Sequence, residues 1–400
     1  MVDSFIPQIR FKMCKNQWRK NKLSKLAKFN PKSTLPEKFK YVDLESVIGT
    51  DLISYREVSR ENAPSRAQRL AQNGDIFYQT VRPYQKNNYL FDSDEKDYVF
   101  STGYAQLRPL IDSAFLLARL QEESFVNKVL ERCTGTSYPA INSKDLSKIS
   151  VTIPQTTEEQ SAIGSLFRTL DDLLASYPDN LANYQSLKAT MLSKMFPEAG
   201  QTVPEIRLDG FEGEWEEKYI GELADIVRGA SPRPIQDPKW FDTNSEIGWL
   251  RISDVTSQNG RIYSLEQKIS KLGQEKTRVL TEPHLLLSIA ATVGKPVVNY
   301  VKTGVHDGFL IFMNPKFDRE FMFQWLEMFR EKWNRYGQPG SQVNLNSDIV
   351  KNQKILVPCM EEQQAIGAYF SNLDNLIVAH QEKISQLENL KKKLLQDMFI

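Results

Sequence analysis

Two sets of donor-rich side chains stand out in the 400-residue sequence, one set in each half. Arginine and lysine contact guanine edges or phosphates, and glutamine and asparagine can bond adenine through two hydrogen bonds. The first set comprises Ser65, Arg66, Arg69, Arg82, Gln85 and Lys86. The second comprises Ser231, Arg233, Arg251, Ser253, Thr292, Lys295, Gln342 and Asn344. Turn chemistry and surface salt bridges explain any single residue at least as well, but the two sets together favour nucleic-acid contact.

Charge is unevenly distributed along the chain, although the net charge is only +1. Basic residues crowd the N-terminal region, at Lys12, Lys15, Arg19, Lys20, Lys22, Lys25, Lys28 and Lys32. Such a patch is able to meet phosphates. A solvated N-terminal face explains the same residues, so charge alone leaves both interpretations open.

Residues that could perform catalysis are scarce. His284, His306 and His380 have no metal-ligand spacing, and the cysteines Cys14, Cys133 and Cys359 lie too far apart for a zinc site or a disulfide framework. The sequence lacks a phosphate-binding loop, a glycine-rich dinucleotide turn and the proline-rich motif of amino methyltransferases. We therefore expect a non-catalytic protein that has no metal site and no cofactor of its own.

Length and composition limit the class of protein. A hydrophobic content of 40% and a charged content of 25% fit a soluble chain of two or more domains. No apolar run approaches the roughly 20 residues that a membrane helix needs, and the N-terminus lacks the apolar region of a secretory signal. We therefore expect a cytoplasmic protein without membrane contact.

The sequence contains an internal repeat, which includes the elements that must position these side chains. Residues 158–196 align with 361–399 without a gap, from a shared Glu-Glu-Gln-x-Ala-Ile-Gly to a shared Met-Phe. The start of each half also matches, because Pro7-x-Ile9-Arg10 and Trp18 recur as Pro204-x-Ile206-Arg207 and Trp215. A duplicated chain suggests two similar sites on a repeated frame.

Each copy of the long repeat predicts an amphipathic helix. Thr156 and Thr157 are candidate caps of the first helix, and its apolar residues alternate steps of four and three. Pro178 interrupts only this copy and is expected to bend the helix or break it briefly. The shared stripe favours antiparallel packing of the two helices around an approximate two-fold axis. Two unrelated helices, each lying on its own domain, are the alternative.

The segments before each helix predict mixed strand and loop structure, with short apolar runs between glycine and proline. The expected fold class is α+β, with two similar globules joined by two long antiparallel helices that form a coiled coil with pseudo-two-fold symmetry. The expected boundaries are a first globule at 1–157, a first spacer helix at 158–197, a second globule at 198–357 and a second spacer helix at 358–400.

The chain resembles the DNA specificity subunit of type I restriction-modification systems. The resemblance rests on the paired Glu-Gln-x-Ala-Ile-Gly helices that end in Met-Phe, and on short segments in each half. Those segments are Pro64-Ser-Arg-Ala, Thr80-Val-Arg-Pro, Gly229-Ala-Ser-Pro-Arg-Pro, Ile252-Ser-Asp and Ala291-Thr-Val-Gly. The ordered combination covers nearly the whole chain, whereas each short motif alone is weak.

The resemblance implies two target-recognition domains, each reading one half of a split sequence in double-stranded DNA, with the helices as a spacer. It also implies that the helices dock two methyltransferase subunits, which supply S-adenosylmethionine and methylate adenine, and that restriction (motor-nuclease) subunits join them. The subunit itself would do no chemistry. We assign partner binding to the apolar helix residues Ile163, Phe167, Leu170, Ile366, Phe370 and Leu373.

Two other functions remain as alternatives. A self-sufficient DNA methyltransferase or nuclease would transfer methyl groups or cut DNA without partners. A coiled-coil scaffold would hold two protein-binding lobes and would have no DNA role. Salt-sensitive binding of duplex DNA would separate the scaffold from the other two.

Overall fold

The computed structural model describes residues 6–289, 292–336 and 345–399. The chain divides into two units: unit 1 comprises Met1–Asn180 together with His380–Ile400, and unit 2 comprises Leu181–Ala379. The long helices α5 (Thr157–Lys194) and α11 (Met360–Asp397) each belong partly to one unit and partly to the other. Each unit therefore contains the first part of one long helix and the last part of the other.

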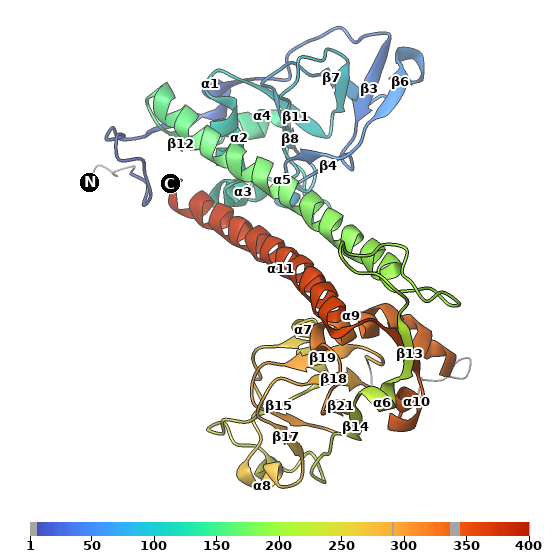
Figure 1. The fold of residues 1–400 in the computed structure, drawn as a ribbon. Helices are drawn as coiled ribbons and strands as arrows, with labels where there is room; N and C mark the ends of the chain where they lie inside the picture. Colours follow the sequence, from blue (N-terminus) through green and yellow to red (C-terminus); the bar gives the residue numbers. More distant parts are fainter. Residues whose placement is uncertain (1–5, 290–291, 337–344, 400) are drawn as a thin grey trace. The chain divides into compact units, whose positions relative to one another are not determined.

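The short strands of unit 1 form two four-stranded sheets and two strand pairs (Figure 1). Its strands are β1 (Arg19–Lys22), β2 (Ala27–Phe29), β3 (Lys38–Val42), β4 (Val47–Ile48), β5 (Asp51–Leu52), β6 (Arg56–Ser59), β7 (Ala67–Leu70), β8 (Ile76–Gln79), β9 (Tyr89–Leu90), β10 (Tyr98–Ser101), β11 (Tyr104–Pro109) and β12 (Ser150–Ile153). The larger sheets have the orders β6-β3-β10-β7 and β2-β11-β8-β9, and the smaller ones pair β1 with β12 and β4 with β5. Its helices, apart from α5, are α1 (Leu23–Leu26), η1 (Arg60–Asn62), η2 (Pro83–Gln85), α2 (Ser113–Gln121), α3 (Glu123–Leu130) and α4 (Ser143–Ser147).

Unit 2 has a five-stranded sheet of order β14-β21-β18-β19-β16, a sheet of order β15-β20-β17, and a β13-β22 pair. Its strands are β13 (Glu216–Tyr219), β14 (Asp225–Arg228), β15 (Gly248–Trp249), β16 (Arg261–Ile262), β17 (Arg278–Leu280), β18 (Leu285–Ser288), β19 (Pro296–Asn299), β20 (Thr303–Val305), β21 (Phe309–Met313) and β22 (Lys354–Val357). Its helices, apart from α11, are α6 (Ile220–Leu223), η3 (Pro238–Trp240), α7 (Ile252–Ser257), α8 (Lys271–Gln274), α9 (Arg319–Phe329), η4 (Arg330–Tyr336) and α10 (Ser347–Lys351). The predicted α+β class is confirmed in both units.

The two long helices pair antiparallel within each unit. In unit 1, α5 and α11 join through the ion pair of Asp171 with Lys391 and through Tyr177 and His380, whose ring centroids lie 5.4 Å apart. In unit 2, Lys188 of α5 lies 2.5 Å from Asp374 of α11. Residue numbers rise along one helix as they fall along the other. The predicted antiparallel pairing is therefore confirmed in each unit.

Local sequence accounts for where α5 begins. The hydroxyl of Thr156 accepts a hydrogen bond from the backbone N–H of Glu159 at 3.3 Å, which satisfies one of the free donors of the first turn. The helix then runs without a break through Pro178 to Lys194, so the predicted brief interruption is wrong. Proline removes one backbone hydrogen bond, and the side-chain contacts of α5 with α11 in unit 1 offset that loss.

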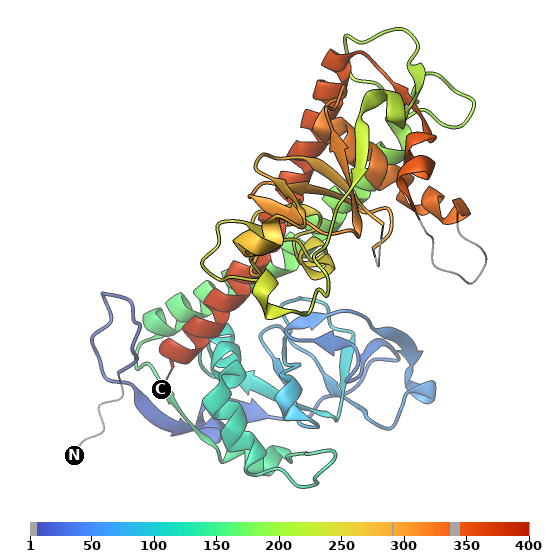
Figure 2. The same cartoon turned by 90° about the horizontal axis from the view of Figure 1, so that it is seen from below.

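The residues after each long helix pack into matched cores, and in unit 1 the C-terminal end of α11 lies beside the first turns of α5 (Figure 1 and Figure 2). In unit 1, Phe399 packs against Phe115 of α2 and Phe167 of α5, with ring centroids 5.9 and 5.8 Å away. In unit 2, Phe196 packs against Phe321 of α9 and Phe370 of α11, at 5.4 and 6.3 Å. The Met-Phe that follows each long helix therefore completes a core formed by the start of the other helix.

A buried carboxylate at the start of each long helix holds the matching N-terminal segment. Glu159, 1% exposed, accepts hydrogen bonds from Arg10 Nε at 2.6 Å and from Trp18 Nε1 at 3.1 Å. Glu362, also 1% exposed, accepts from Arg207 Nε at 2.8 Å and from Arg207 Nη2 at 2.7 Å. The hydrogen bonds to these carboxylates raise the pKa of both arginines. The sequence match between the two halves thus reflects a repeated ion pair.

Within the described residues, no helix is long and apolar enough to cross a membrane.

Candidate nucleic-acid interface

The turn after β8 presents a cation and aromatic rings on the surface of unit 1. Arg82 has φ 54° and Lys86 has φ 57°, which place both residues in the left-handed region on either side of η2. The guanidinium of Arg82 lies 4.4 Å from the ring centroid of Tyr138, which is 63% exposed, and Tyr84 is 50% exposed. In such a pair, the guanidinium can bond the edge of a base, and the exposed ring can contact the face of a base.

A pocket of about 380 Å³ lies beside this turn, lined by Leu44, Glu45, Val47, Ile48, Gln79, Val81, Arg82, Gln85 and Asn87. Gln85 is oriented by Gln79, whose amide donates to the Gln85 carbonyl oxygen at 2.8 Å. That bond fixes the direction of the Gln85 amide, whose nitrogen donates no hydrogen bond among the described residues and can donate to a ligand. The pocket brings two of the predicted residues, Arg82 and Gln85, to one edge.

The other predicted residues of unit 1 divide by burial. Ser65 and Arg66 form an exposed turn, and the Arg66 side chain has no hydrogen bond or ion pair among the described residues. Arg69 lies in β7, and burial lowers its pKa. Lys86 forms an ion pair with Glu123. Arg66 is therefore more accessible to DNA than Arg69 or Lys86.

In unit 2, two arginines contact Asp307. Ser231 Oγ donates to Asp307 Oδ1 at 2.7 Å, and Arg233 Nη2 lies 2.6 Å from Oδ2. Arg228 Nε donates to the backbone carbonyl of Asp307 at 2.6 Å. The intervening Gly229 is required, since a Cβ there would lie 2.1 Å from the carbonyl oxygen of His306. The Arg-Gly-Ala-Ser-Pro-Arg segment thus holds two exposed arginines at one residue, Arg233 on the carboxylate of Asp307 and Arg228 on its backbone carbonyl.

The remaining predicted residues of unit 2 are less available. Arg251 pairs with Asp254 at 2.8 Å, at the start of α7, and Lys295 pairs with Glu327. Ser253 is exposed, and Thr292 Oγ1 lies 3.1 Å from Ser288 Oγ. Gln342 and Asn344 lie outside the described residues. The structure therefore brings Ser231 and Arg233 together but does not bring Thr292 and Lys295 to the same exposed group.

Sequence reasoning missed four exposed residues at these sites. Tyr84 and Tyr138 flank Arg82 in unit 1. Arg228 borders Gly229 in unit 2, and Arg278 donates to the Arg228 carbonyl at 2.7 Å. The position of Arg228, next to a motif already noted, was the only signal available in the sequence. Tyr138 and Arg278 reach their sites only through the fold.

His306, which precedes Asp307, is held with its ring nitrogen Nδ1 as an acceptor. Its Nδ1 accepts a hydrogen bond from the backbone N–H of Gly308 at 2.8 Å, and its ring lies against Phe309 and Trp249. Burial lowers the pKa of His306 below its ordinary 6.5, and the nearby Asp307 only partly opposes this. Among the described residues, no group of three or more His, Cys, Asp or Glu side chains is arranged to hold a metal ion.

We expect unit 2 to lose stability as pH falls below about 6.5, because the unfolded chain then binds a proton at His306 that the folded chain resists. Urea unfolding between pH 7.5 and 5.5 measures this loss. The His306→Asn variant, whose amide oxygen can accept the same hydrogen bond without titrating, should show a smaller pH dependence. An equal pH dependence in both proteins would contradict the prediction.

A family model of the type I restriction modification DNA specificity domain matches the chain twice, at residues 15–180 and 212–389. The chain belongs to this family. The two matches coincide with the two halves of the internal repeat, so each half is one specificity domain. The role of the chain is DNA recognition as a specificity subunit of a type I restriction-modification system.

Relatives and solved structures agree with this assignment. The type I restriction enzyme MjaVIII specificity subunit of Methanocaldococcus jannaschii is 23% identical over 305 residues, which cover 72% of this chain and 70% of that protein. The S subunit of a type I system from M. genitalium has the same fold, with a TM-score of 0.62, 14% identity and 99% of each chain covered. A chain from a study of type I complex assembly and conformational transition has a TM-score of 0.53, 22% identity, and 94% and 96% coverage.

The six helix residues assigned to partner binding need revision. Ile163, Phe167, Leu170, Ile366, Phe370 and Leu373 are each at most 6% exposed. They form part of the two cores, against α2 in unit 1 and α9 in unit 2. A partner could reach these side chains only if the specificity domain opened, because they pack inside its core. We therefore assign them to packing.

Proposed function

We propose that each specificity domain reads one half of a bipartite DNA target, with Arg66, Arg82 and Gln85 in unit 1 and Arg228, Arg233 and Arg278 in unit 2. The observation that carries this proposal is the contrast between the two units. Their ion pairs, caps and terminal aromatic residues repeat, whereas their exposed arginine sites use different elements. A repeated frame with unlike sites is suited to two unlike half-sites.

The chain itself is proposed to do no chemistry. Two methyltransferase subunits would supply S-adenosylmethionine and methylate adenine, and restriction subunits would join the complex. The exposed apolar residues of the long helices are the candidates for docking the methyltransferases. They are Leu187, its repeat counterpart Leu390, Leu376 and Val378. Exposed apolar residues on a surface helix are suited to a protein interface.

A domain exchange tests the bipartite reading. Residues 30–150 are replaced by the matching segment of another family member, and methylated adenines are mapped in cells that also carry the partner subunits. We expect one half-site to change and the other half-site to stay the same. A change in both half-sites would refute the proposal. Methyl transfer by the purified chain, with S-adenosylmethionine and DNA but without partners, would instead establish a self-sufficient enzyme.

Arg82→Ala is expected to weaken binding to the cognate duplex by about 1–3 kcal/mol and to relax the preference at one base position. The Arg82→Lys variant separates two roles, since lysine retains a phosphate contact but cannot make the bidentate contact of arginine. Titration of duplexes that vary at single positions measures both effects. Lys96→Ala, at an exposed lysine outside the pocket, is the control and should leave the base preference unchanged. Unchanged specificity in Arg82→Ala would exclude a base contact.

A further inference from the structure

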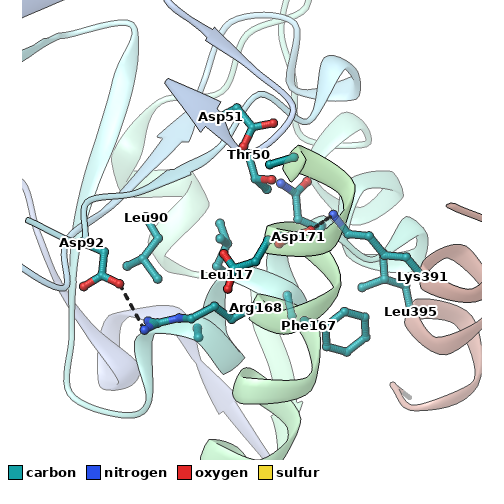
Figure 3. Close-up of a pocket in the computed structure, with 15 residues that line it drawn as sticks. Thr50, Asp51, Leu90, Asp92, Leu117, Phe167, Arg168, Asp171, Lys391 and Leu395 are labelled. Carbon is teal, nitrogen blue, oxygen red and sulfur yellow. Dashed lines mark hydrogen bonds and ion pairs between the residues drawn. The ribbon is translucent and has the colours of Figure 1, made fainter. Parts of the chain in front are cut away.

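Unit 1 contains a second cavity, of about 170 Å³, lined by residues of α2, α5 and α11 and by other residues of the unit (Figure 3). It is lined by Thr50, Asp51, Leu90, Asp92, Ala114, Leu117, Ala118, Gln121, Phe167, Arg168, Asp171, Asp172, Ala175, Lys391 and Leu395. Its volume is several times the roughly 30 Å³ that one water occupies in the liquid. The apolar residues Ala114, Leu117 and Ala118 of α2 and the charged residues of α5 thus line a space that is large enough for a planar polar group.

The charges on this cavity do not balance. Arg168 Nη1 lies 3.1 Å from Asp92 Oδ2, and Lys391 pairs with Oδ1 of Asp171 (Figure 3). The second oxygen of Asp171 has no hydrogen-bond partner among the described residues, and the side chains of Asp51 and Asp172 have none either. Burial, with the charges of Asp51 and Asp172, raises the pKa of Asp171, while Lys391 lowers it. The cavity therefore has an excess of negative charge.

The repeat provides an internal comparison, since Asp374 in unit 2 is the counterpart of Asp171. There, Lys188 again takes Oδ1 of the aspartate, at 2.5 Å. The other oxygen, Oδ2, faces the guanidinium of Arg261 at 3.3 Å. Arg261 also pairs with Glu320 and lies 3.9 Å from the ring centroid of Phe323. In unit 2, a buried guanidinium thus occupies the space beside the matching carboxylate.

The lining residues of the two sites correspond along the capped helices α2 and α9. Asp112 caps α2 by accepting from Phe115 N–H, and Asp318 caps α9 by accepting from Phe321 N–H, so these helices align. With that alignment, the cavity residues Ala114, Leu117 and Ala118 correspond to Glu320, Phe323 and Gln324. Small or aliphatic residues in unit 1 replace three large ones, and the arginine that does line the cavity, Arg168, pairs with Asp92 and not with Asp171. The cavity is therefore the counterpart of the unit 2 arginine site, but no guanidinium bonds its aspartate among the described residues.

We propose that this cavity binds a guanidinium group, presented as an arginine side chain by a protein partner. Arginine suits the site because its planar fork can bond the open oxygen of Asp171 and a second carboxylate at once. Asp51 and Asp172 are placed to supply that second carboxylate. The ring of Phe167, which lines the cavity, offers an apolar surface to the planar group.

The first test uses the isolated full chain and ethylguanidinium chloride as the probe. Methyl resonances of Ala114, Leu117 and Ala118 should shift in a saturable manner, whereas equal concentrations of ethylammonium chloride should shift them much less. In Asp171→Asn the affinity for ethylguanidinium should fall by about tenfold, because a charge-assisted hydrogen bond is lost. No saturable shift in the wild-type chain, or equal shifts with both probes, would overturn the proposal.

A matched variant in unit 2 provides a positive control. Arg261→Ala removes the resident guanidinium, so ethylguanidinium should gain a second binding site beside Asp374, reported by the side-chain amide resonances of Gln324, which donates to Asp374 Oδ2 at 2.9 Å. Thermal unfolding of this variant should recover when ethylguanidinium is added and should not recover with ethylammonium. Absence of selective recovery would show that these carboxylates do not select guanidinium, and the proposal for unit 1 would fall with it.

The source of the guanidinium is tested in the assembled complex, and this step alone rests on the proposed function. When methyltransferase subunits are bound, the probe should no longer shift the Leu117 and Ala118 methyls, and Asp171→Asn should weaken assembly by about tenfold. A probe that still binds in the complex would exclude a methyltransferase arginine. Because the isolated-chain experiments require no partner, their result stands apart from the outcome of the proposed function.

Discussion

Phe196→Ala is expected to destabilise unit 2 by about 3–5 kcal/mol, the usual loss when a fully packed aromatic ring is deleted. Phe196 is buried, and its ring lies within 6.3 Å, centroid to centroid, of Trp215, Phe321 and Phe370. Its removal opens a cavity among the end of α5, the start of α11 and α9. Urea unfolding followed by tryptophan fluorescence measures the effect, because every tryptophan except Trp18 lies in unit 2.

The repeat supplies a matched variant for this prediction. Phe399→Ala removes the counterpart ring from unit 1, where it packs against Trp18, Phe115 and Phe167. Its loss should fall on unit 1 and leave most of the tryptophan signal unchanged. Leu187→Ala, at a partly exposed position on α5, should cost less than about 1 kcal/mol. A Phe196→Ala protein that unfolds at the wild-type urea concentration would contradict the packing described here.

Glu362→Ala is expected to cost about 2–4 kcal/mol. The substitution leaves Arg207 without the carboxylate that accepts two of its hydrogen bonds, and an unpaired charge in a largely buried position is strongly unfavourable. The loss falls in the lower part of the range for buried pairs, since Arg207 keeps its hydrogen bonds to the carbonyls of Glu212 and Gly213. Equilibrium unfolding in urea gives the free energy.

Glu361→Ala is the natural control, because Glu361 precedes Glu362 and is exposed. It loses only a favourable interaction with the start of the helix, about 0.3–1 kcal/mol. The double variant Arg207→Ala with Glu362→Ala should be more stable than Glu362→Ala alone, since it leaves no buried charge unpaired. Equal stability of Glu361→Ala and Glu362→Ala would show that this ion pair does not hold the N-terminal segment of unit 2.

The frame could be predicted from the sequence because its signals are local or repeated. The cap at Thr156 and the heptad stripe are matters of spacing, and the internal repeat identified both long helices. Of the two effects expected of Pro178, the brief break is wrong, since α5 continues through it, while the bend stays a prediction. The six apolar residues that we assigned to partner binding pack in the cores instead. A heptad stripe predicts that one face of a helix is buried, but it does not predict which element covers that face.

The candidate site could be predicted only in part, because pairing across the fold decides which cations are free. Lys86 and Lys295 appeared equivalent to Arg66 in the sequence, yet their ion pairs with Glu123 and Glu327 leave them 31% and 12% exposed, whereas Arg233 stays 70% exposed in its pair with Asp307. Arg69 was indistinguishable from Arg66 until the register of β7 placed it opposite Phe100 of β10. Arg278 comes to Arg228 from a strand 50 residues away, and no local pattern records that meeting.

The division of the chain into units has a consequence for biosynthesis. When a ribosome has delivered residue 379, every segment of unit 2 has been made, but unit 1 still lacks Leu387, Met398 and Phe399. Unit 1 is thus translated first but completed last. Until Phe399 is made, its contacts with Phe115 and Phe167 cannot form. A premature stop codon in α11 after residue 379 would consequently remove part of the core of unit 1, the unit that begins at the N-terminus, and leave every segment of unit 2 in place.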